Sequence, residues 1–346
     1  MTIGFVGTHE RSDMVGNGED LLTNGLNMKR GNVAESLIIL ATNLAKNKIV
    51  FPQLLIPTLK RFASDDSLAV RAMILRRLSY FQYLQPEFGW ELFDIIISKS
   101  NDELWGIAEP YLYYSYHNNF TRVSQLLDEI YNTSTEKALQ TWGRISALAV
   151  LDNKIDTQCF IHQLQHKNSI DAWTGAMTVW TNSKNIVSHQ QICFDSILVA
   201  LQNQNDEIVI SVAKATAKIF RNLESIVSIP LNIVNFFFDV LEKSKDKNQF
   251  GLYDFDGWLA NLAKNYPQDA LILALRFIRF VQKTNFHFYN HNNAIFQLLN
   301  RLFREAEEIE EIDNGTMLQQ VIALQDACLA INVRGFDSWL RDAERI

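Results

Sequence analysis

Helix-breaking residues are scarce through most of this sequence. Its 346 residues include only 6 prolines and 14 glycines, and five of the glycines lie within the first 25 residues. Because proline and glycine destabilise helix interiors more than other residues, the remainder suits a mostly helical fold. With 47% hydrophobic residues, the chain can bury a large core, either in two domains or in one elongated array.

Cysteine is also rare, and long uninterrupted apolar runs are missing. Cys159, Cys193 and Cys328 lie far apart and outside any CxxC motif, so we expect reduced structural thiols and a cytoplasmic protein. The most apolar segment, 269–281, is interrupted by two arginines, which predicts a buried helix rather than a membrane span. The first thirteen residues lack a basic region followed by an apolar run, so no secretory signal is expected.

Positive charge is not in excess. The formal net charge of −7 argues against a general binder of nucleic acid or anionic membranes, because such proteins normally carry a basic surplus. A local basic patch remains compatible with this total. The charge therefore favours a protein partner over nucleic acid and predicts no membrane association.

Motifs for catalysis are missing as well. The sequence contains no GxxxxGK[ST], GxSxG, HExxH or CxxC pattern, and the pair Gly16 and Gly18 lacks the preceding strand and third glycine of a phosphate loop. His287 and His291 have the four-residue spacing of metal ligands on a helix, but no third ligand is nearby and the local residues favour a loop. We therefore expect no enzymatic activity, no cofactor and no metal.

What the sequence does contain is a recurring helix start. A small polar residue precedes an amphipathic stretch six times at intervals of 33 to 36 residues, as a helix N-cap does. In the first of these stretches, Glu35 has the position that a capping box requires. A near-constant period in this range indicates a repeat array. The predicted caps are Asn32, Asp65, Asn101, Ser134, Ser169 and Asn205.

A second apolar segment lies between successive caps, so each repeat is predicted to hold two helices. Paired amphipathic helices bury their apolar faces only by stacking on neighbouring pairs. The sequence therefore predicts an all-α fold, an α-solenoid of stacked antiparallel helix pairs with a right-handed superhelix. The second helices are expected at 51–63, 87–100, 120–131, 156–165 and 189–202.

Three regions are expected along the chain. Residues 1–19 are glycine-rich and form a flexible N-terminal segment, and residues 20–225 form repeats of about 35 residues. Residues 226–346 form a less regular helical continuation or C-terminal cap. Further helices are expected in that last region at 231–243, 254–265, 268–283, 292–307 and 316–332.

Two sequence stretches resemble known families. "DDSLAVR" at 65–71 resembles a HEAT repeat. Segment 20–78 and the final stretch from 317 are similar to the HEAT-like C-terminal region of bacterial STAND-type NTPases, some of which act in antiviral defence. This resemblance implies a sensing or scaffolding role without the NTPase module, which the sequence lacks.

Several groups of side chains are candidates for partner binding. Exposed aromatic residues could stack on a ligand, but Trp105, Trp142, Trp173 and Trp180 lie in predicted repeat helices, where core packing is the stronger interpretation. The tyrosines of segment 109–119 cannot all face one way on a helix. A basic strip on a concave surface, for an acidic partner or a phosphate backbone, is predicted from Lys60, Arg61, Arg71, Arg76 and Arg77, with an ordinary solvated face as the alternative interpretation.

The predicted function is a non-enzymatic scaffold or sensor that binds a protein partner, and the oligomeric state stays open. The acidic segment 304–313 is interpreted either as a solvated helix end or as a docking site for a basic partner. The alternative function is a HEAT-like DNA-repair glycosylase or another nucleic-acid-binding solenoid. That alternative requires a basic groove in which Trp258 is exposed beside Asp254 and Asp256.

Overall fold

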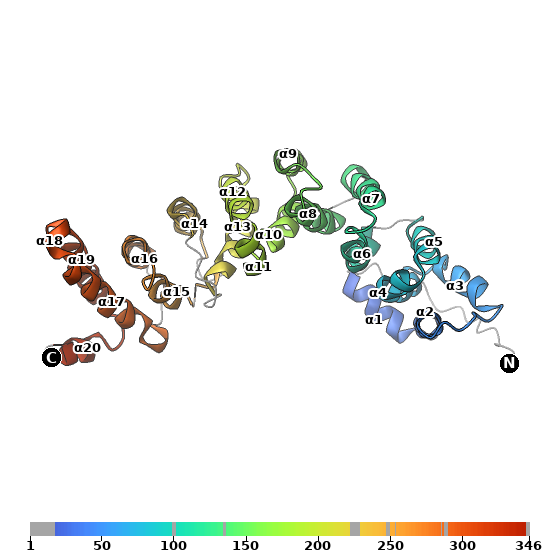
Figure 1. The fold of residues 1–346 in the computed structure, drawn as a ribbon, viewed down its shortest axis with the longest axis horizontal. Helices are drawn as coiled ribbons and strands as arrows, with labels where there is room; N and C mark the ends of the chain where they lie inside the picture. The colour runs from blue at the N-terminus through green and yellow to red at the C-terminus, as the bar shows by residue number, and fades with distance from the viewer. Residues whose placement is uncertain are drawn as a thin grey trace. The chain divides into compact units, whose positions relative to one another are not determined.

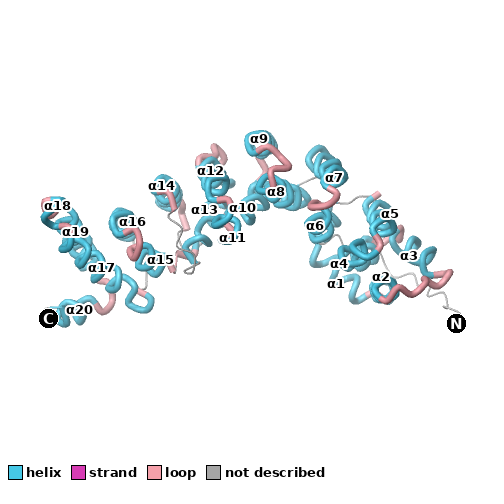
Figure 2. Tube along the Cα trace, in the orientation of Figure 1, coloured by secondary structure: helices cyan, strands magenta, loops and turns pink. Residues whose placement is uncertain are grey.

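The structure, a computed structural model, describes residues 18–98, 102–133, 136–221, 229–246, 250–252, 254–284, 286 and 290–343. Across these residues the regular secondary structure is entirely helical, joined by turns and loops (Figure 2). The chain divides into two compact units, Met1–Ile155 and Asp156–Ile346, which we call unit 1 and unit 2. The boundary falls inside the region 20–225 that the sequence predicts as repeats, and the predicted division near 225 stays a prediction.

Unit 1 is built from two layers of helices (Figure 1). In one layer α2 packs against α4, α4 against α6, and α6 against α8, while α1 covers α2 and α4. In the other layer α3 packs against α5, and α7 lies against α6 and α8. The helices are α1 (Gly18–Asn27), α2 (Lys29–Lys46), α3 (Leu55–Ala63), α4 (Leu68–Leu84), α5 (Pro86–Ile97), α6 (Asp102–Ser115), α7 (Phe120–Thr133) and α8 (Glu136–Leu151).

Unit 2 repeats this layered pattern. Helix α10 packs against α13, α12 against α14, α14 against α16, α15 against α17, and α16 against α19. The 3₁₀ turn Ala217–Arg221 directly follows α13, and the 3₁₀ turn His291–Asn293 directly precedes α17. The helices are α9 (Thr157–Lys167), α10 (Ile170–Trp180), α11 (Ser183–Ser188), α12 (Gln190–Leu201), α13 (Asp206–Thr216), α14 (Leu231–Lys243), α15 (Phe255–Leu262), α16 (Pro267–Thr284), α17 (Ala294–Glu308), α18 (Glu310–Asp313), α19 (Thr316–Ala330) and α20 (Phe336–Ala343).

Two of the predicted N-caps are confirmed. The Ser169 hydroxyl accepts a hydrogen bond from the backbone N–H of Ala172 at 3.3 Å and starts α10. The Asn205 side chain accepts from the N–H of Glu207 at 3.0 Å and starts α13. Each bond satisfies a backbone donor that has no partner in the first helical turn.

Two other predicted caps are wrong in position. Asn32 lies inside α2, and its side-chain amide donates to the carbonyl of Leu26. Ser67 is the residue that precedes α4, and the Asp65 carboxylate accepts from the Ser67 N–H at 2.9 Å. The acidic residue thus closes a turn before the helix instead of capping it. Asn101 and Ser134 lie outside the described residues.

A close approach of backbones explains why α1 and α2 are separate helices joined by a tight turn. A side-chain carbon built on Gly31 would lie 2.0 Å from the Gly25 carbonyl oxygen, and one on Gly25 would lie 2.8 Å from the Ala69 carbonyl oxygen of α4. Only glycine fits at such distances. Both glycines belong to the segment 20–78 that carries the family resemblance.

Hydrogen bonds between helices of one layer join residues a similar distance apart in sequence. Thr141 donates to the carbonyl of Trp105, 36 residues earlier, and Thr174 bonds Ser211, 37 residues later. Arg144 pairs with Glu109, 35 residues earlier, and Arg276 with Asp239, 37 residues earlier. These separations match the period predicted from the sequence.

Candidate partner-binding surface

Arg71 does not belong to an exposed basic strip. It is 3% exposed, and its Nη1 donates to the backbone carbonyl of Ile96 at 2.9 Å. This bond connects the first turn of α4 to the end of α5, where the last helical carbonyls lack intrahelical partners. Arg71 therefore serves the packing of unit 1, and the predicted strip loses its central member because the side chain points between helices.

The remaining four basic residues divide into two places. Lys60 and Arg61 lie on α3, and Lys60 forms an ion pair with Glu91 of α5. Arg76 and Arg77 lie on α4, and both approach the Glu35 carboxylate of α2. The strip was predicted because these residues are close in the sequence. In the structure they are divided, because α3 and α4 belong to different layers of the unit.

Glu35 links α2 to α4 instead of capping α2. Its Oε1 lies 2.8 Å from Nε of Arg77 and 3.7 Å from Nε of Arg76. The Arg30 guanidinium, one turn earlier on α2, lies 3.2 Å from the Asp65 carboxylate. The two ion pairs advance in the same direction along both segments, so α2 and α4 run parallel.

Next to these arginines, α4 presents a pair of tyrosines to solvent. Tyr80 is 51% exposed and Tyr83 is 76% exposed, and their rings stack with centroids 6.5 Å apart and planes 10° from parallel. Tyr80 follows Arg76 by four residues and Arg77 by three, so the three side chains share one helix face. Tyr80 and Tyr83 were not among the predicted binding residues. Their three-residue spacing beside Arg76 and Arg77 could have indicated an exposed face of this helix.

The tyrosines of α6 face two ways, as predicted. Tyr111 is fully buried, and its ring stacks on Phe93 with centroids 4.3 Å apart. Tyr113 and Tyr114 are exposed, and α6 packs directly against α4. We call the half-buried Arg76 and the exposed arginine and tyrosines of these two neighbouring helices the Arg–Tyr surface, consisting of Arg76, Arg77, Tyr80, Tyr83, Tyr113 and Tyr114.

The predicted core role of the four repeat tryptophans is confirmed. Trp105 and Trp142 of unit 1 and Trp173 and Trp180 of unit 2 are at most 2% exposed. Trp173 and Trp180 pack edge to face with ring centroids 6.4 Å apart, and Phe160 of α9 adds a further edge contact to Trp180. These side chains fill the spaces between helices and cannot stack on a ligand.

Charge in unit 1 is locally balanced. In addition to the pairs above, Arg122 of α7 pairs with Asp94 of α5, and Arg144 of α8 pairs with Glu109 of α6. Burial raises the pKa of the Glu109 carboxyl, and the neighbouring Arg144 charge offsets part of that rise. Because these arginines already face carboxylates, they are less available to neutralise a phosphate backbone.

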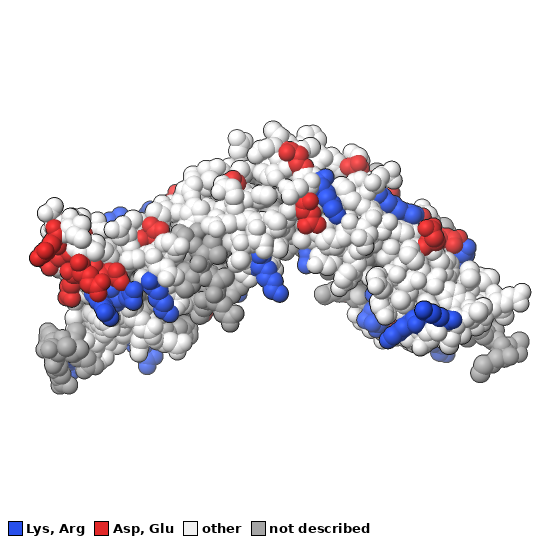
Figure 3. Space-filling view, viewed as in Figure 1, with Lys and Arg blue, Asp and Glu red and all other residues white. Residues whose placement is uncertain are grey.

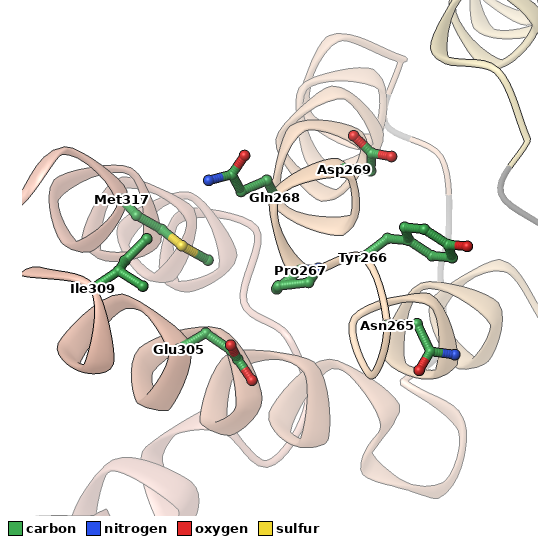
Figure 4. A pocket seen from close by; sticks show the side chains of 8 residues that line it. All are labelled: Asn265, Tyr266, Pro267, Gln268, Asp269, Glu305, Ile309 and Met317. Carbon is green, nitrogen blue, oxygen red and sulfur yellow. The ribbon is translucent and has the colours of Figure 1, made fainter. Parts of the chain in front are cut away.

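A cavity of about 310 Å³ lies in unit 2 near the ends of α16, α17 and α19. Figure 4 shows Glu305, Ile309 and Met317 on one side and residues 265–269, from the turn before α16 and its first helical turn, on the other. Glu305 pairs with Arg301 at 2.9 Å, and Asp269 lies in the first turn of α16. The lining combines apolar side chains, amides and two carboxylates, and it offers no nucleophile beside a base.

Acidic side chains gather next to this cavity. Figure 3 shows them over the region of α17 and α18, where Glu307, Glu310 and Glu311 are exposed. Asp313 has a structural role, because its carboxylate accepts from the N–H groups of Gly315 and Met317 at the start of α19. The segment 304–313 thus combines a helix-starting aspartate with a solvated acidic face.

The residues required for a glycosylase are not arranged as that alternative needs. Trp258 is 4% exposed, and its ring packs on Phe220 and Phe255 with centroids 5.0 and 5.4 Å away. Asp256 is 1% exposed, whereas Asp254 is exposed at the start of α15. The tryptophan therefore belongs to an aromatic core cluster and does not face a groove.

The remaining sequence candidates give no metal or phosphate site. Gly16 and His287 lie outside the described residues, and Gly18 begins α1. Within the part of the chain that the structure describes, no cluster of three histidine, cysteine or acidic side chains is placed to hold a metal ion. Cys193 and Cys328 are buried, which raises the pKa of each thiol to about 12, while Cys159 is exposed.

Comparison with known proteins found no match. No family model, no curated protein and no solved structure matches the chain. Among the described helices, none has the length and apolar character needed to cross a bilayer. The described residues therefore establish an all-helical fold. A proposal for the function has to be based on the surfaces described above.

Proposed function

We propose that this protein is a helical-repeat scaffold, an α-solenoid of HEAT type with a right-handed superhelix, that binds a protein partner without catalysing a reaction. The observation that carries the proposal is the Arg–Tyr surface of unit 1. Stacked tyrosines of 51% and 76% exposure beside two arginines are unusual for a surface that only meets water.

The repeat architecture is supported by the spacing of contacts between helices. Of the hydrogen bonds that join one helix to the next in its layer, two in each unit span 35 to 37 residues, while others span fewer or more, up to 45. Such a chain has contacts mainly between neighbouring repeats, which is the defining property of a solenoid.

The chemistry of the Arg–Tyr surface favours a protein. Tyrosine and arginine are enriched among the residues that dominate binding energy at protein interfaces, because each combines a large contact area with hydrogen-bonding groups. Nucleic acid requires several cations that are free to neutralise phosphates. The pairing of Arg76 and Arg77 with Glu35 and the net charge of −7 both weaken that alternative.

The biological setting follows from the resemblance to STAND-type NTPases. The stretches at 20–78 and from 317 to the end support a role as the sensor or scaffold part of a bacterial antiviral system. In that role the protein recognises a partner that appears or changes during phage infection, in the bacterial cytoplasm. The resemblance supports the setting only, and the Arg–Tyr surface supports the binding.

The test is affinity capture of the tagged chain from bacteria with and without phage, followed by measurement of the recovered partner's affinity. The triple variant Arg77→Ser, Tyr80→Ser, Tyr83→Ser removes one charge and two exposed rings without touching the core. We expect it to bind the purified partner at least 10-fold more weakly than the natural chain, because hot-spot truncations cost more than about 1.4 kcal/mol.

The matched control is Lys48→Ser, Ile49→Ser, Val50→Ser in the turn before α3. It also removes one charge and two exposed apolar side chains, since Ile49 is 55% and Val50 is 90% exposed. We expect it to bind as the natural chain does. Equal binding by the two triple variants, or recovery of the same proteins by both, would contradict the proposal. Retention of duplex DNA at physiological salt would favour the nucleic-acid alternative.

A further inference from the structure

Two neighbouring cavities in unit 2 lie beside successive corners between helices. One cavity, about 720 Å³, is lined by Gln165 and Asn168 at the end of α9 and by the corner between α12 and α13. The other, about 440 Å³, lies between that same corner and α14. Gln202 and Asn203 line both cavities. The two cavities therefore adjoin at this corner, and we call them together the amide groove.

The first part of the groove is lined almost entirely by side-chain amides. Six of its seven lining residues are asparagine or glutamine, and the seventh is Val199. The amide of Asn205 donates to the side-chain oxygen of Asn168, its counterpart 37 residues earlier, at 3.4 Å. The Thr174–Ser211 bond has the same separation, so the amides lie at equivalent corners of neighbouring helix pairs.

Much of the hydrogen-bonding capacity of these amides is unused. Asn203 and Asn205 each have a side-chain oxygen that accepts from a backbone N–H of the corner itself. The side chains of Gln165, Gln202 and Gln204 have no hydrogen-bond partner among the residues described. A side-chain amide offers one carbonyl acceptor and an N–H donor, which is the complement of a peptide group.

The second part of the groove is apolar with charged edges. Phe236 of α14 is 36% exposed, and Ile210 and Val240 flank the same cavity. Asp239 is occupied by Arg276 at 2.7 Å, whereas Asp206 has no ion-pair partner among the described residues. An apolar side chain of a ligand therefore fits on Phe236, and a basic one fits beside Asp206.

We propose that the amide groove binds an extended segment of a partner protein. Its main chain lies along the glutamine side chains, one apolar side chain packs on Phe236, and one basic side chain meets Asp206. A peptide is favoured over a sugar because branched aliphatic side chains surround Phe236 and accept an aliphatic group better than a flat ring. All of these residues belong to unit 2, so this site is separate from the Arg–Tyr surface.

Selection from a phage-displayed library of random 12-residue peptides on the full-length chain provides the probe. The enriched peptides are synthesised, and their affinities are measured by fluorescence polarisation. We expect at least 10-fold weaker binding to Phe236→Ser and to the double variant Gln202→Ala, Gln204→Ala. We expect Asp206→Asn to weaken peptides that carry a lysine or arginine by about 3-fold, since an exposed ion pair contributes little.

Two controls match these changes. Ile272→Ser on α16 removes an apolar side chain of 45% exposure, and Gln125→Ala on α7 removes an exposed amide in unit 1. Both should bind the peptides as the natural chain does, and so should the triple variant of the Arg–Tyr surface. Failure of either proposal is thus distinguishable from failure of the other.

The inference is overturned if no peptide is enriched, or if the enriched peptides bind the groove variants as tightly as the natural chain. Retention of oligosaccharides on a glycan array, together with the absence of peptide binding, would also overturn it. Circular dichroism of each variant confirms that it is folded, because Phe236, Gln202 and Gln204 lie at the surface and their loss should leave the helices intact.

Discussion

The two units differ in how many aromatic side chains they expose. Unit 1 exposes four tyrosines on α4 and α6, although it also buries an aromatic cluster in which Tyr111 stacks on Phe93. Unit 2 buries a cluster of phenylalanines centred on Phe255, whose ring contacts Phe220, Phe238 and Phe277 with centroids 4.9 to 5.2 Å away. Aromatic rings thus pack the core of both units, and unit 1 presents more of them to solvent.

This difference separates stability from recognition. A buried ring contributes through area removed from water and through edge-to-face contacts, so its loss weakens folding. An exposed stacked ring contributes little to folding and remains free to contact a partner. Unit 2 therefore depends on its aromatic core, and its candidate ligand site is built mainly from amides instead.

The largest expected effect comes from exchanging a core ring for a small side chain. Phe255→Ala should lower the free energy of unfolding by about 3–5 kcal/mol, because it opens a cavity in the centre of the cluster. Tyr83→Ala should change it by less than about 0.5 kcal/mol. Urea unfolding followed by circular dichroism measures both. Similar losses for the two variants would remove the contrast between the units.

The next largest effect concerns the basic residues of unit 1. Arg71→Ala should cost about 2–3 kcal/mol, since it leaves the buried Ile96 carbonyl without its charged donor. Arg77→Ala breaks an ion pair whose arginine is 47% exposed and should cost at most about 1 kcal/mol. Urea midpoints distinguish the two, and a larger loss for Arg77→Ala would show that the strip is structural.

Helix caps give an effect of intermediate size. Asn205→Ala removes the acceptor for the Glu207 N–H and should destabilise unit 2 by about 1 kcal/mol. Asn32→Ala in unit 1 should cost less, because Asn32 accepts no N–H of the first turn of α2 and its exposed side chain only donates to the Leu26 carbonyl. Thermal unfolding of both variants tests this ordering. An equal loss of thermal stability in the two variants would indicate that Asn32 does act as a helix cap.

The smallest effect is a difference in acid response. Burial raises the pKa of Glu109, so its contribution to stability increases as the pH falls from above that raised value toward about 4.5. For Glu242 burial acts in the same direction, but Lys283 and Arg276 together lower the pKa. Its contribution is therefore present above about 4.5 and is lost as the pH falls through the lowered value.

Thermal midpoints at pH 7, 5 and 3.5 measure this difference. Glu242→Gln should reduce the loss of stability between pH 5 and 3.5. Glu109→Gln should leave that loss in place and change the response above pH 4.5 instead. The same slope for both variants and the natural chain would show that neither carboxyl titrates differently on folding.

Helix positions were predicted well from the sequence, but the contacts between helix surfaces were not. Periodicity and polar starts predicted α14 at 231–243 to the residue and placed α5, α7 and α12 within a few positions. Capping failed at Asn32 because two glycines let α1 and α2 approach closely, which a local pattern does not encode. The short helix α11 was missed because six residues are too few for a periodic pattern.

The candidate sites were predicted less well for a physical reason. Neighbours along a chain are not neighbours across a layer, so Arg71 turned inward while Arg77 met Glu35 of another helix. The amide groove depends on residues 37 positions apart that only helix packing brings together. The sequence shows the cluster of glutamine and asparagine at 202–205. It does not show that these residues line the same cavity as Gln165.

The hydrogen bonds described between separate helices close loops of at most 45 residues. Short loops cost little entropy to close, and chains with such local contacts fold quickly. A helix emerging from the ribosome therefore meets its partner after one further helix pair has been synthesised. Folding can follow translation step by step, and a truncated product should retain native structure up to its last completed pair.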